Sequence, residues 1–260
     1  FTSWSATISA NAPVSFTGGS TSVMALDGTS VQTDSDGTAT LALGGNGIFS
    51  SISATTPTSS VSFSAANGDT LQSGFSQTST IALNKSETTI GVFTNPTYYG
   101  FEYQTYGAWG SYGNATTSAN AISVGNATPV TGLPATGSYT FTGGASGYYS
   151  DPSKYAYVTN ANMTATASFD TRTLTFSTSG TYISGSPSGS AIPAPSLNLA
   201  GTLAITNGAN QISGTVTTVN GMSGNANGKF YGPTANEVGG TYAVSGSGLG
   251  SFVGGFGGKR

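Results

Sequence analysis

The stretch GKFYGPTANEVGG, residues Gly228–Gly240, decides the fold. Because neighbouring side chains of a strand point to opposite faces, one of Phe230 and Tyr231 is expected to fill an interior and the other to lie outside. Pro233 fixes φ and favours a turn after Gly232. The paired glycines that follow Glu237 suit a strand that bends. The stretch therefore predicts a hairpin of a strongly curved sheet, and hence of a closed β-barrel.

Alternating apolar and polar residues continue this pattern on both sides of the hairpin. Asn207–Gly208, a dipeptide typical of two-residue hairpin turns, separates two such runs, and Asp170–Arg172 separates two others. We expect strands at Tyr98–Trp109, Tyr139–Thr142, Ala161–Asp170, Thr173–Ile183, Leu197–Ile205, Ile212–Val219, Met222–Tyr231, Val238–Val244 and Leu249–Phe256. About eight strands joined by short turns predict an antiparallel barrel whose interior side chains can fill.

The first third of the chain differs from the rest in composition. It is rich in Ser and Thr and poor in aromatic residues, although short β-prone runs occur at Thr38–Leu43, Ser59–Ala65 and Ser79–Asn84. We interpret residues 1–92 as a small N-terminal β-rich domain and residues 93–260 as the barrel domain. The expected fold class is therefore all-β, with a C-terminal eight-stranded antiparallel barrel.

Composition restricts the classes of function. Charged residues make up 6% of the 260 residues and the net charge is −3, so no basic patch predicts a nucleic-acid partner. The sequence has neither His nor Cys, which removes the usual general bases and thiol nucleophiles, and we expect no enzyme, no metal site and no cofactor. No apolar run is long enough for a membrane helix. A chain that begins at Phe1 rather than Met suggests a secreted or cell-surface protein after signal-peptide removal.

The C-terminal sequence GKFYGPTANEVGGTYAV, followed shortly by GSFVGGFGGKR, resembles the barrel end of transferrin-binding protein B-like surface proteins. The resemblance extends over roughly Tyr98–Arg260. It implies a β-barrel preceded by a handle-like domain, and capture of host transferrin or, in secreted relatives, of haem. We interpret the matching residues as a barrel-closure motif: Phe230, Tyr231, Gly232, Pro233, Glu237, Gly239, Gly240, Phe256, Gly257 and Lys259.

Two functional hypotheses follow. The first is a self-assembling subunit of a filament or surface layer, in which uncharged aromatic side chains make contacts and a terminal strand with Phe1, Trp4 and Ile8 adds to a neighbouring sheet. The alternative is a binding protein that captures haem, an iron-carrier protein or another apolar ligand, with Tyr as a candidate haem ligand. The candidate contact aromatics are Tyr98, Tyr99, Tyr103, Tyr106, Trp109, Tyr112, Tyr148 and Tyr149.

Overall fold

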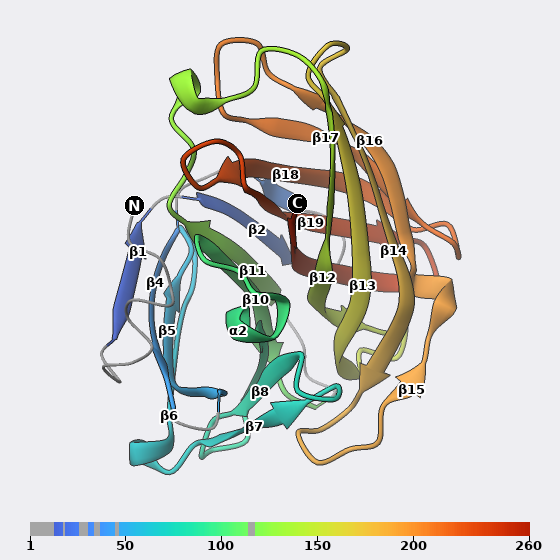
Figure 1. Ribbon diagram of the computed structural model, residues 1–260. Helices are drawn as coiled ribbons and strands as arrows, with labels where there is room; N and C mark the ends of the chain where they lie inside the picture. The colour runs from blue at the N-terminus through green and yellow to red at the C-terminus, as the bar shows by residue number, and fades with distance from the viewer. Residues whose placement is uncertain (1–12, 18, 26–30, 34–36, 45–46, 114–117) are drawn as a thin grey trace.

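The computed structural model describes residues 13–17, 19–25, 31–33, 37–44, 47–113 and 118–260. Within these residues the protein consists of three β layers, which we call the outer sheet, the middle sheet and the barrel (Figure 1). The middle sheet lies between the other two layers. Its position determines which residues of the barrel are covered and which are exposed to solvent.

The outer sheet has the strand order β1-β4-β5-β6, and the middle sheet has the order β3-β2-β11-β10-β9-β8-β7. The outer strands are β1 (Val14–Thr17), β4 (Thr38–Leu43), β5 (Phe49–Thr55) and β6 (Ser60–Ser64). The middle strands are β2 (Gly19–Ala25), β3 (Val31–Thr33), β7 (Thr70–Gly74), β8 (Ser79–Leu83), β9 (Thr89–Thr94), β10 (Gln104–Ser111) and β11 (Ser118–Gly125). A one-turn helix, α2 (Pro96–Tyr99), connects β9 to β10.

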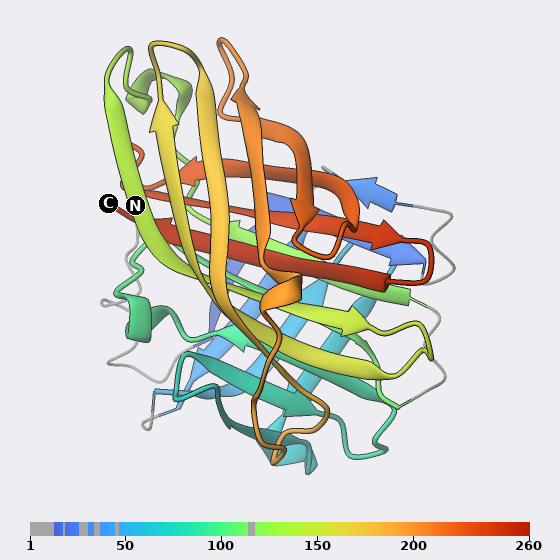
Figure 2. The ribbon, with the colours of Figure 1, turned by 90° about the vertical axis from the view of Figure 1, so that its right-hand side faces the viewer.

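The barrel is a ring of eight antiparallel strands that ends with the last strand of the chain. Its order is β12-β13-β14-β16-β17-β18-β19-β20, and β20 returns to pair with β12. The strands are β12 (Ser138–Ser150), β13 (Ala156–Ser168), β14 (Thr173–Ser184), β16 (Leu199–Ile205), β17 (Ile212–Thr218), β18 (Ser223–Tyr231), β19 (Glu237–Gly246) and β20 (Gly250–Lys259). A short strand, β15 (Ile192–Pro193), pairs with β14 outside the ring. Figure 2 shows the long barrel strands from the side.

Each of the two spaces beside the middle sheet holds an apolar core. Trp109 and Phe93 of the middle sheet stack at 6.3 Å between ring centroids and pack with Phe63 of the outer sheet. On the opposite face, Ala108 and Val92 pack against the outside of the barrel, where Val253 contributes. Because both faces are covered, β10 is almost entirely buried. Burial on both faces explains why its sequence is not a simple alternation of apolar and polar residues.

The barrel interior is a third core. Phe141, Phe169 and Phe230 form one aromatic cluster, with centroid distances of 5.9 Å and 5.2 Å to the Phe230 ring. The aromatic rings of Phe176 on β14 and Phe256 on β20 pack against each other inside the barrel, with 4.6 Å between their centroids. Aliphatic side chains and the buried Met163 and Met222 fill the remainder. This close packing is what an eight-stranded barrel permits.

The all-β fold and the eight-stranded barrel predicted from the sequence are confirmed. One expected barrel strand, Tyr98–Trp109, is wrong. Tyr98 and Tyr99 belong to helix α2, and the strand that begins at Gln104 is β10 of the middle sheet, which pairs with β9 and β11. The division of the chain at residues 92 and 93 stays a prediction, although the pairing of β10 and β11 favours a division between Gly125 and Ser138. Among the described residues, no helix has the length and apolar character needed to span a bilayer.

Candidate functional site

The junction between the barrel and the middle sheet gathers the residues of the C-terminal motif. Glu237 begins β19 and is 1% exposed, although it is a carboxylate. Its Oε1 accepts a hydrogen bond of 2.6 Å from the backbone nitrogen of Glu102, and its Oε2 accepts one of 3.2 Å from that of Tyr103. Both donors belong to the segment between α2 and β10. Glu237 therefore attaches the barrel to the segment that follows α2.

Burial changes the acidity of this carboxyl group. Removal from water raises the pKa of Glu237 to about 7, while the two backbone donors and the neighbouring Lys259 oppose that rise. A buried carboxylate without full compensation prefers its neutral form. Glu237 therefore changes its protonation state near neutral pH.

Lys259 holds the same segment from the adjacent strand. Glu237 and Lys259 face each other across the β19–β20 pair. The Nζ of Lys259 donates a hydrogen bond of 2.9 Å to the carbonyl oxygen of Gly100. Gly100 ends α2 in the left-handed region, at φ 65°, which glycine adopts at low cost. Glu237 and Lys259, at the open end of the β19–β20 hairpin, thus hold the segment Gly100–Tyr103 through hydrogen bonds at both of its ends.

Further polar contacts continue the junction along β10 and β11. Tyr231 lies outside the barrel wall, and its hydroxyl group lies 3.1 Å from the Oγ of Ser123. The Nε2 of Gln104 donates a hydrogen bond of 2.7 Å to the carbonyl oxygen of Val238. Burial raises the pKa of Tyr231 to about 12, so this hydroxyl group remains protonated at physiological pH.

Glycines of the motif allow the middle sheet to approach closely. A Cβ atom at Gly239 would overlap the Oε1 of Gln104. At Gly257 a Cβ atom would lie 2.7 Å from the ring of Tyr106, which is closer than real side chains approach. These two glycines therefore serve the contact between layers in addition to the curvature of the strands.

The remaining motif residues lie inside the barrel or in its turn. Phe230 and Phe256 are fully buried in the interior, and for Phe230 this agrees with the expectation that one residue of the Phe230–Tyr231 pair points inward. Gly232, at φ 84°, and Pro233 form the turn, and the carbonyl oxygen of Gly232 accepts a bond of 2.6 Å from Thr128. Gly240 packs against the backbone of β18. The role of the motif in closing the barrel stays a prediction. The structure shows in addition that several of its residues contact the middle sheet.

A buried group of hydroxyl and amide side chains, which we call the hydroxyl seam, joins β8 and β9 to β12 and β13. The Oγ of Ser146 lies 3.2 Å from the Oγ of Ser79 and 3.0 Å from the Oγ1 of Thr94. The Nδ2 of Asn160 donates hydrogen bonds of 3.1 Å to Ser79 and 3.2 Å to Ser146. The seam contains no ionised group, and each of its four members has at least one partner within it.

The surface beside α2 is the most exposed aromatic part of this region. Tyr98 is 54% exposed, whereas its neighbour Tyr99 turns inward and stacks on Phe101 at 5.4 Å. A hollow of about 350 Å³ adjoins Tyr98. The lining residues are uncharged: Gly47, Ile48, Ser73, Gln77, Asn95, Thr97 and Tyr98. We call this surface the α2 face.

The aromatic contact surface expected from the sequence is not present as a patch. Tyr106 and Trp109 of the middle sheet and Tyr148 of barrel strand β12 are at most 2% exposed, because the layers cover one another at these positions. Tyr99, Tyr103, Tyr112 and Tyr149 are partly buried. Of the eight candidates, Tyr98 alone is exposed. The expected assembly residues Phe1, Trp4 and Ile8 lie outside the described residues.

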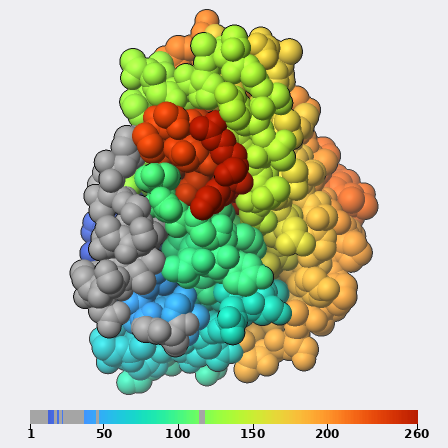
Figure 3. Space-filling model, viewed as in Figure 1, coloured from blue at the N-terminus to red at the C-terminus, as the bar shows by residue number. Residues whose placement is uncertain are grey.

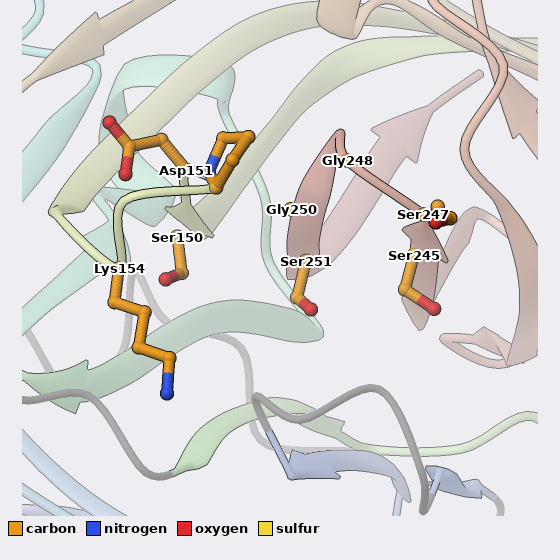
Figure 4. A pocket seen from close by; sticks show the side chains of 10 residues that line it. Ser150, Asp151, Lys154, Ser245, Ser247, Gly248, Gly250 and Ser251 are labelled. Carbon is orange, nitrogen blue, oxygen red and sulfur yellow. The ribbon is translucent and has the colours of Figure 1, made fainter.

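A second hollow, of about 550 Å³, lies between the hairpin β12–β13 and the hairpin β19–β20 (Figure 4). Ser150, Ser245 and Ser251 line it with hydroxyl groups, and Asp151 and Lys154 supply one charge of each sign. The Oδ1 of Asp151 already accepts a hydrogen bond of 2.8 Å from the backbone of Tyr155. This carboxylate therefore stabilises its own hairpin turn.

The barrel interior offers no room for haem, because aromatic and aliphatic side chains fill it. Met163 and Met222, whose sulfur atoms could in principle contact haem, are 2% and 0% exposed within that packing. Among the described residues, no group of three or more acidic side chains is placed to hold a metal ion.

Several junction residues could not be identified from the sequence. Gln104 contacts a strand that lies 134 positions away, and Ser146 contacts Ser79 across 67 positions. Neither residue stands in a recognisable motif. The C-terminal motif identifies Glu237 but not its partners at Glu102 and Tyr103.

Comparison with known proteins shows what the barrel resembles. Residues 133–260 match the model of the C-lobe and N-lobe beta barrels of Tf-binding protein B. The barrel of this chain is therefore similar to these β-barrels over residues 133–260, and its fold is transferrin-binding protein B-like. No curated protein matches the chain.

Solved structures agree on the fold. A transferrin-binding protein B mutant from Haemophilus parasuis Hp5 superposes with a TM-score of 0.53 at 15% identity, over 92% of this chain and 44% of that one. Intact Ap-TbpB, with N and C lobes, gives a TM-score of 0.50 at 15% identity, over 92% and 45%. The chain thus spans less than half the length of these structures, and the likeness concerns their fold.

Proposed function

We propose that this protein is a non-enzymatic binding module of the cell surface or extracellular space that captures an iron-carrier protein of the transferrin class. The proposal is supported by the family of its barrel and by matched structures that carry the name transferrin-binding protein. The module consists of one barrel with its two accompanying sheets. Its ligand docks on the α2 face.

The exposed position of Tyr98 is the observation that carries this assignment. Tyrosine supplies large contact area with little loss of side-chain freedom and is enriched at protein interfaces. Tyr98 lies beside an uncharged hollow, and its backbone is fixed by the contacts of Gly100 and Phe101 to the turn of α2. A rigid exposed aromatic next to a concave polar surface suits a protein ligand.

Self-assembly into a filament or layer has less support. The aromatic side chains on which that hypothesis depended are largely buried between layers. Haem capture also lacks a site in the packed barrel interior. Protein capture is therefore the function that the described residues favour.

The test is a direct binding measurement on the purified chain. We expect saturable binding of at least one of iron-loaded transferrin, iron-free transferrin and lactoferrin to the immobilised protein, with serum albumin as the negative ligand. Tyr98→Ala should weaken binding by roughly tenfold or more, the loss typical of an interface hot spot. Tyr155→Ala is the matched control, because it removes another exposed tyrosine, 40% exposed, from the β12–β13 hairpin.

Absence of binding to all three carriers would contradict the proposed function. Equal losses in the two tyrosine variants would contradict the α2 face as the docking surface. A parallel haem titration, followed by absorbance, separates the remaining ligand class: a saturable Soret shift would favour haem capture instead.

A further inference from the structure

We propose that Glu237 and Lys259 form a clamp that positions the α2 face, so that the last barrel hairpin controls the geometry of the docking surface. This inference rests on the proposed function for the meaning of the α2 face. The clamp itself is a matter of contacts between the barrel and the segment Gly100–Tyr103, and it can be tested without any ligand.

The contacts connect the hairpin to α2 without interruption. Glu237 accepts hydrogen bonds from the backbone of Glu102 and Tyr103, and Lys259 donates one to Gly100. The clamped segment also supplies the cap of α2, because the backbone nitrogen of Phe101 donates a hydrogen bond of 2.8 Å to the carbonyl oxygen of Pro96. Movement at the clamp must therefore displace the turn that carries Tyr98.

The aromatic side chains beneath α2 make the same connection. Phe101 is 2% exposed and stacks on Tyr99, whose ring lies 5.0 Å from that of Tyr98. Tyr106 of β10 also packs against Phe101, with 6.2 Å between the ring centroids. A shift of Gly100–Tyr103 would break this stack, so the closed clamp and the ordered α2 face occur together.

Protonation of Glu237 makes the clamp sensitive to pH. The ionisable groups that face this carboxyl group are Glu102 and Tyr103 on the clamped segment, Tyr231 on β18 and Lys259 on β20. Burial raises the pKa of Glu237 to about 7 in the closed clamp, whereas a carboxyl group released into water returns toward 4.5. The closed clamp therefore binds a proton more tightly than the open clamp.

The direction of the effect follows from this difference. Below the pKa of the open clamp, both forms are protonated and pH has no influence. Between the two values, the open clamp loses its proton while the closed clamp keeps it, so a rise in pH favours opening. Above about 7 both forms are ionised and the influence levels off. The clamp is tightest in mildly acidic solution and loosest in alkaline solution.

The experiment is amide hydrogen exchange on the full chain between pH 5.5 and 8.5, corrected for the intrinsic rate. For the amides of Glu102 and Tyr103, we expect the opening equilibrium to increase by roughly 30-fold across this range, from the linkage between proton binding and opening. Amides of Ala165 and Thr202 in the barrel wall report global unfolding, and their slower exchange at every pH should distinguish local opening of the clamp from unfolding of the whole chain.

Two variants sharpen the result. Glu237→Gln retains the size of the side chain and removes its titration, so exchange at Glu102 and Tyr103 should no longer depend on pH. Lys259→Met removes the cation that opposes proton uptake by Glu237. The midpoint of the pH profile of exchange should therefore lie at higher pH in this variant than in the wild type. Lys259 is exposed, so this second variant keeps the test valid should the buried substitution prevent folding.

Exchange at Glu102 and Tyr103 that is independent of pH in the wild type, or equally dependent in Glu237→Gln, would overturn the clamp. The proposed function fails separately, when no iron carrier binds. A clamp that responds to pH in a protein that binds no carrier would leave the clamp intact and refute the ligand assignment.

Discussion

The Oε1 of Glu237, at the start of a barrel strand, lies 2.6 Å from the backbone nitrogen of Glu102, beside the middle sheet. The two residues are 135 positions apart in sequence, and their hydrogen bond joins the two halves of the molecule. A buried carboxylate that accepts backbone donors is stabilising only when those donors offset its loss of hydration. The stability of the whole protein should therefore depend on the charge of this group.

The free energy of unfolding should rise as the pH falls from 8 to 5. The pKa of Glu237 is about 7 in the folded protein against 4.5 for the ordinary group, so ionisation costs the folded state up to about 3 kcal/mol at pH 8. Urea unfolding at several pH values measures this change. The difference between wild type and Glu237→Gln isolates the contribution of Glu237, and a difference independent of pH would refute it.

Gly239→Ala should destabilise the protein by about 2 kcal/mol, a typical cost of overpacking, because the new methyl group overlaps the side chain of Gln104. The double variant Gly239→Ala/Gln104→Ala provides the control, since it removes the obstructing amide. Thermal unfolding of the four proteins in the cycle measures the coupling. Additive losses would show that the close approach of the two layers is not the cause.

Phe230→Ala should cost about 3–5 kcal/mol, the usual loss for a large aromatic side chain removed from a core. Phe230 is 0% exposed and contacts both Phe141 and Phe169. Tyr98→Ala, at an exposed position, should change the free energy of unfolding by less than about 1 kcal/mol. Urea denaturation measures the free energy of unfolding of both variants. Similar losses in Phe230→Ala and Tyr98→Ala would contradict the assignment of Phe230 to the core.

Ser146→Ala should cost about 1–3 kcal/mol, because it leaves the buried groups of Ser79, Thr94 and Asn160 without one shared partner. Thr140→Val is the matched control: its hydroxyl group also pairs, at 3.1 Å with Thr166, but on the exposed surface. Chemical denaturation should show little change for the control. Equal losses of unfolding free energy in the two variants would mean that burial does not increase the contribution of the hydroxyl seam to stability.

Local signals in the sequence predict the barrel well. The Asn207–Gly208 turn and the corner at Arg172 lie where the structure has turns, with φ 73° at Gly208 and 53° at Arg172. Short hairpins depend on neighbouring residues alone, so alternation and turn chemistry suffice to place their strands. Among the runs predicted, Thr38–Leu43 has the same bounds as β4.

Assignment of strands to layers could not be made in the same way. β10 lies between two covered faces, so its sequence gives no indication of which sheet it joins. The partners of Glu237, Gln104 and Ser146 are likewise defined by the docking of layers that are distant in sequence. The residue types alone do not indicate which distant residues will be their partners, because those partners come together only when the layers pack in the folded chain.

The hydroxyl seam connects the middle sheet to the barrel through hydrogen bonds that dissolved ions do not weaken. Mobile ions screen interactions between charges, and the seam is made of neutral dipoles shielded from solvent. Dilution into fresh water or transfer to brine should leave this part of the attachment unchanged. This contact between the middle sheet and the barrel should therefore hold over a wide range of salinity.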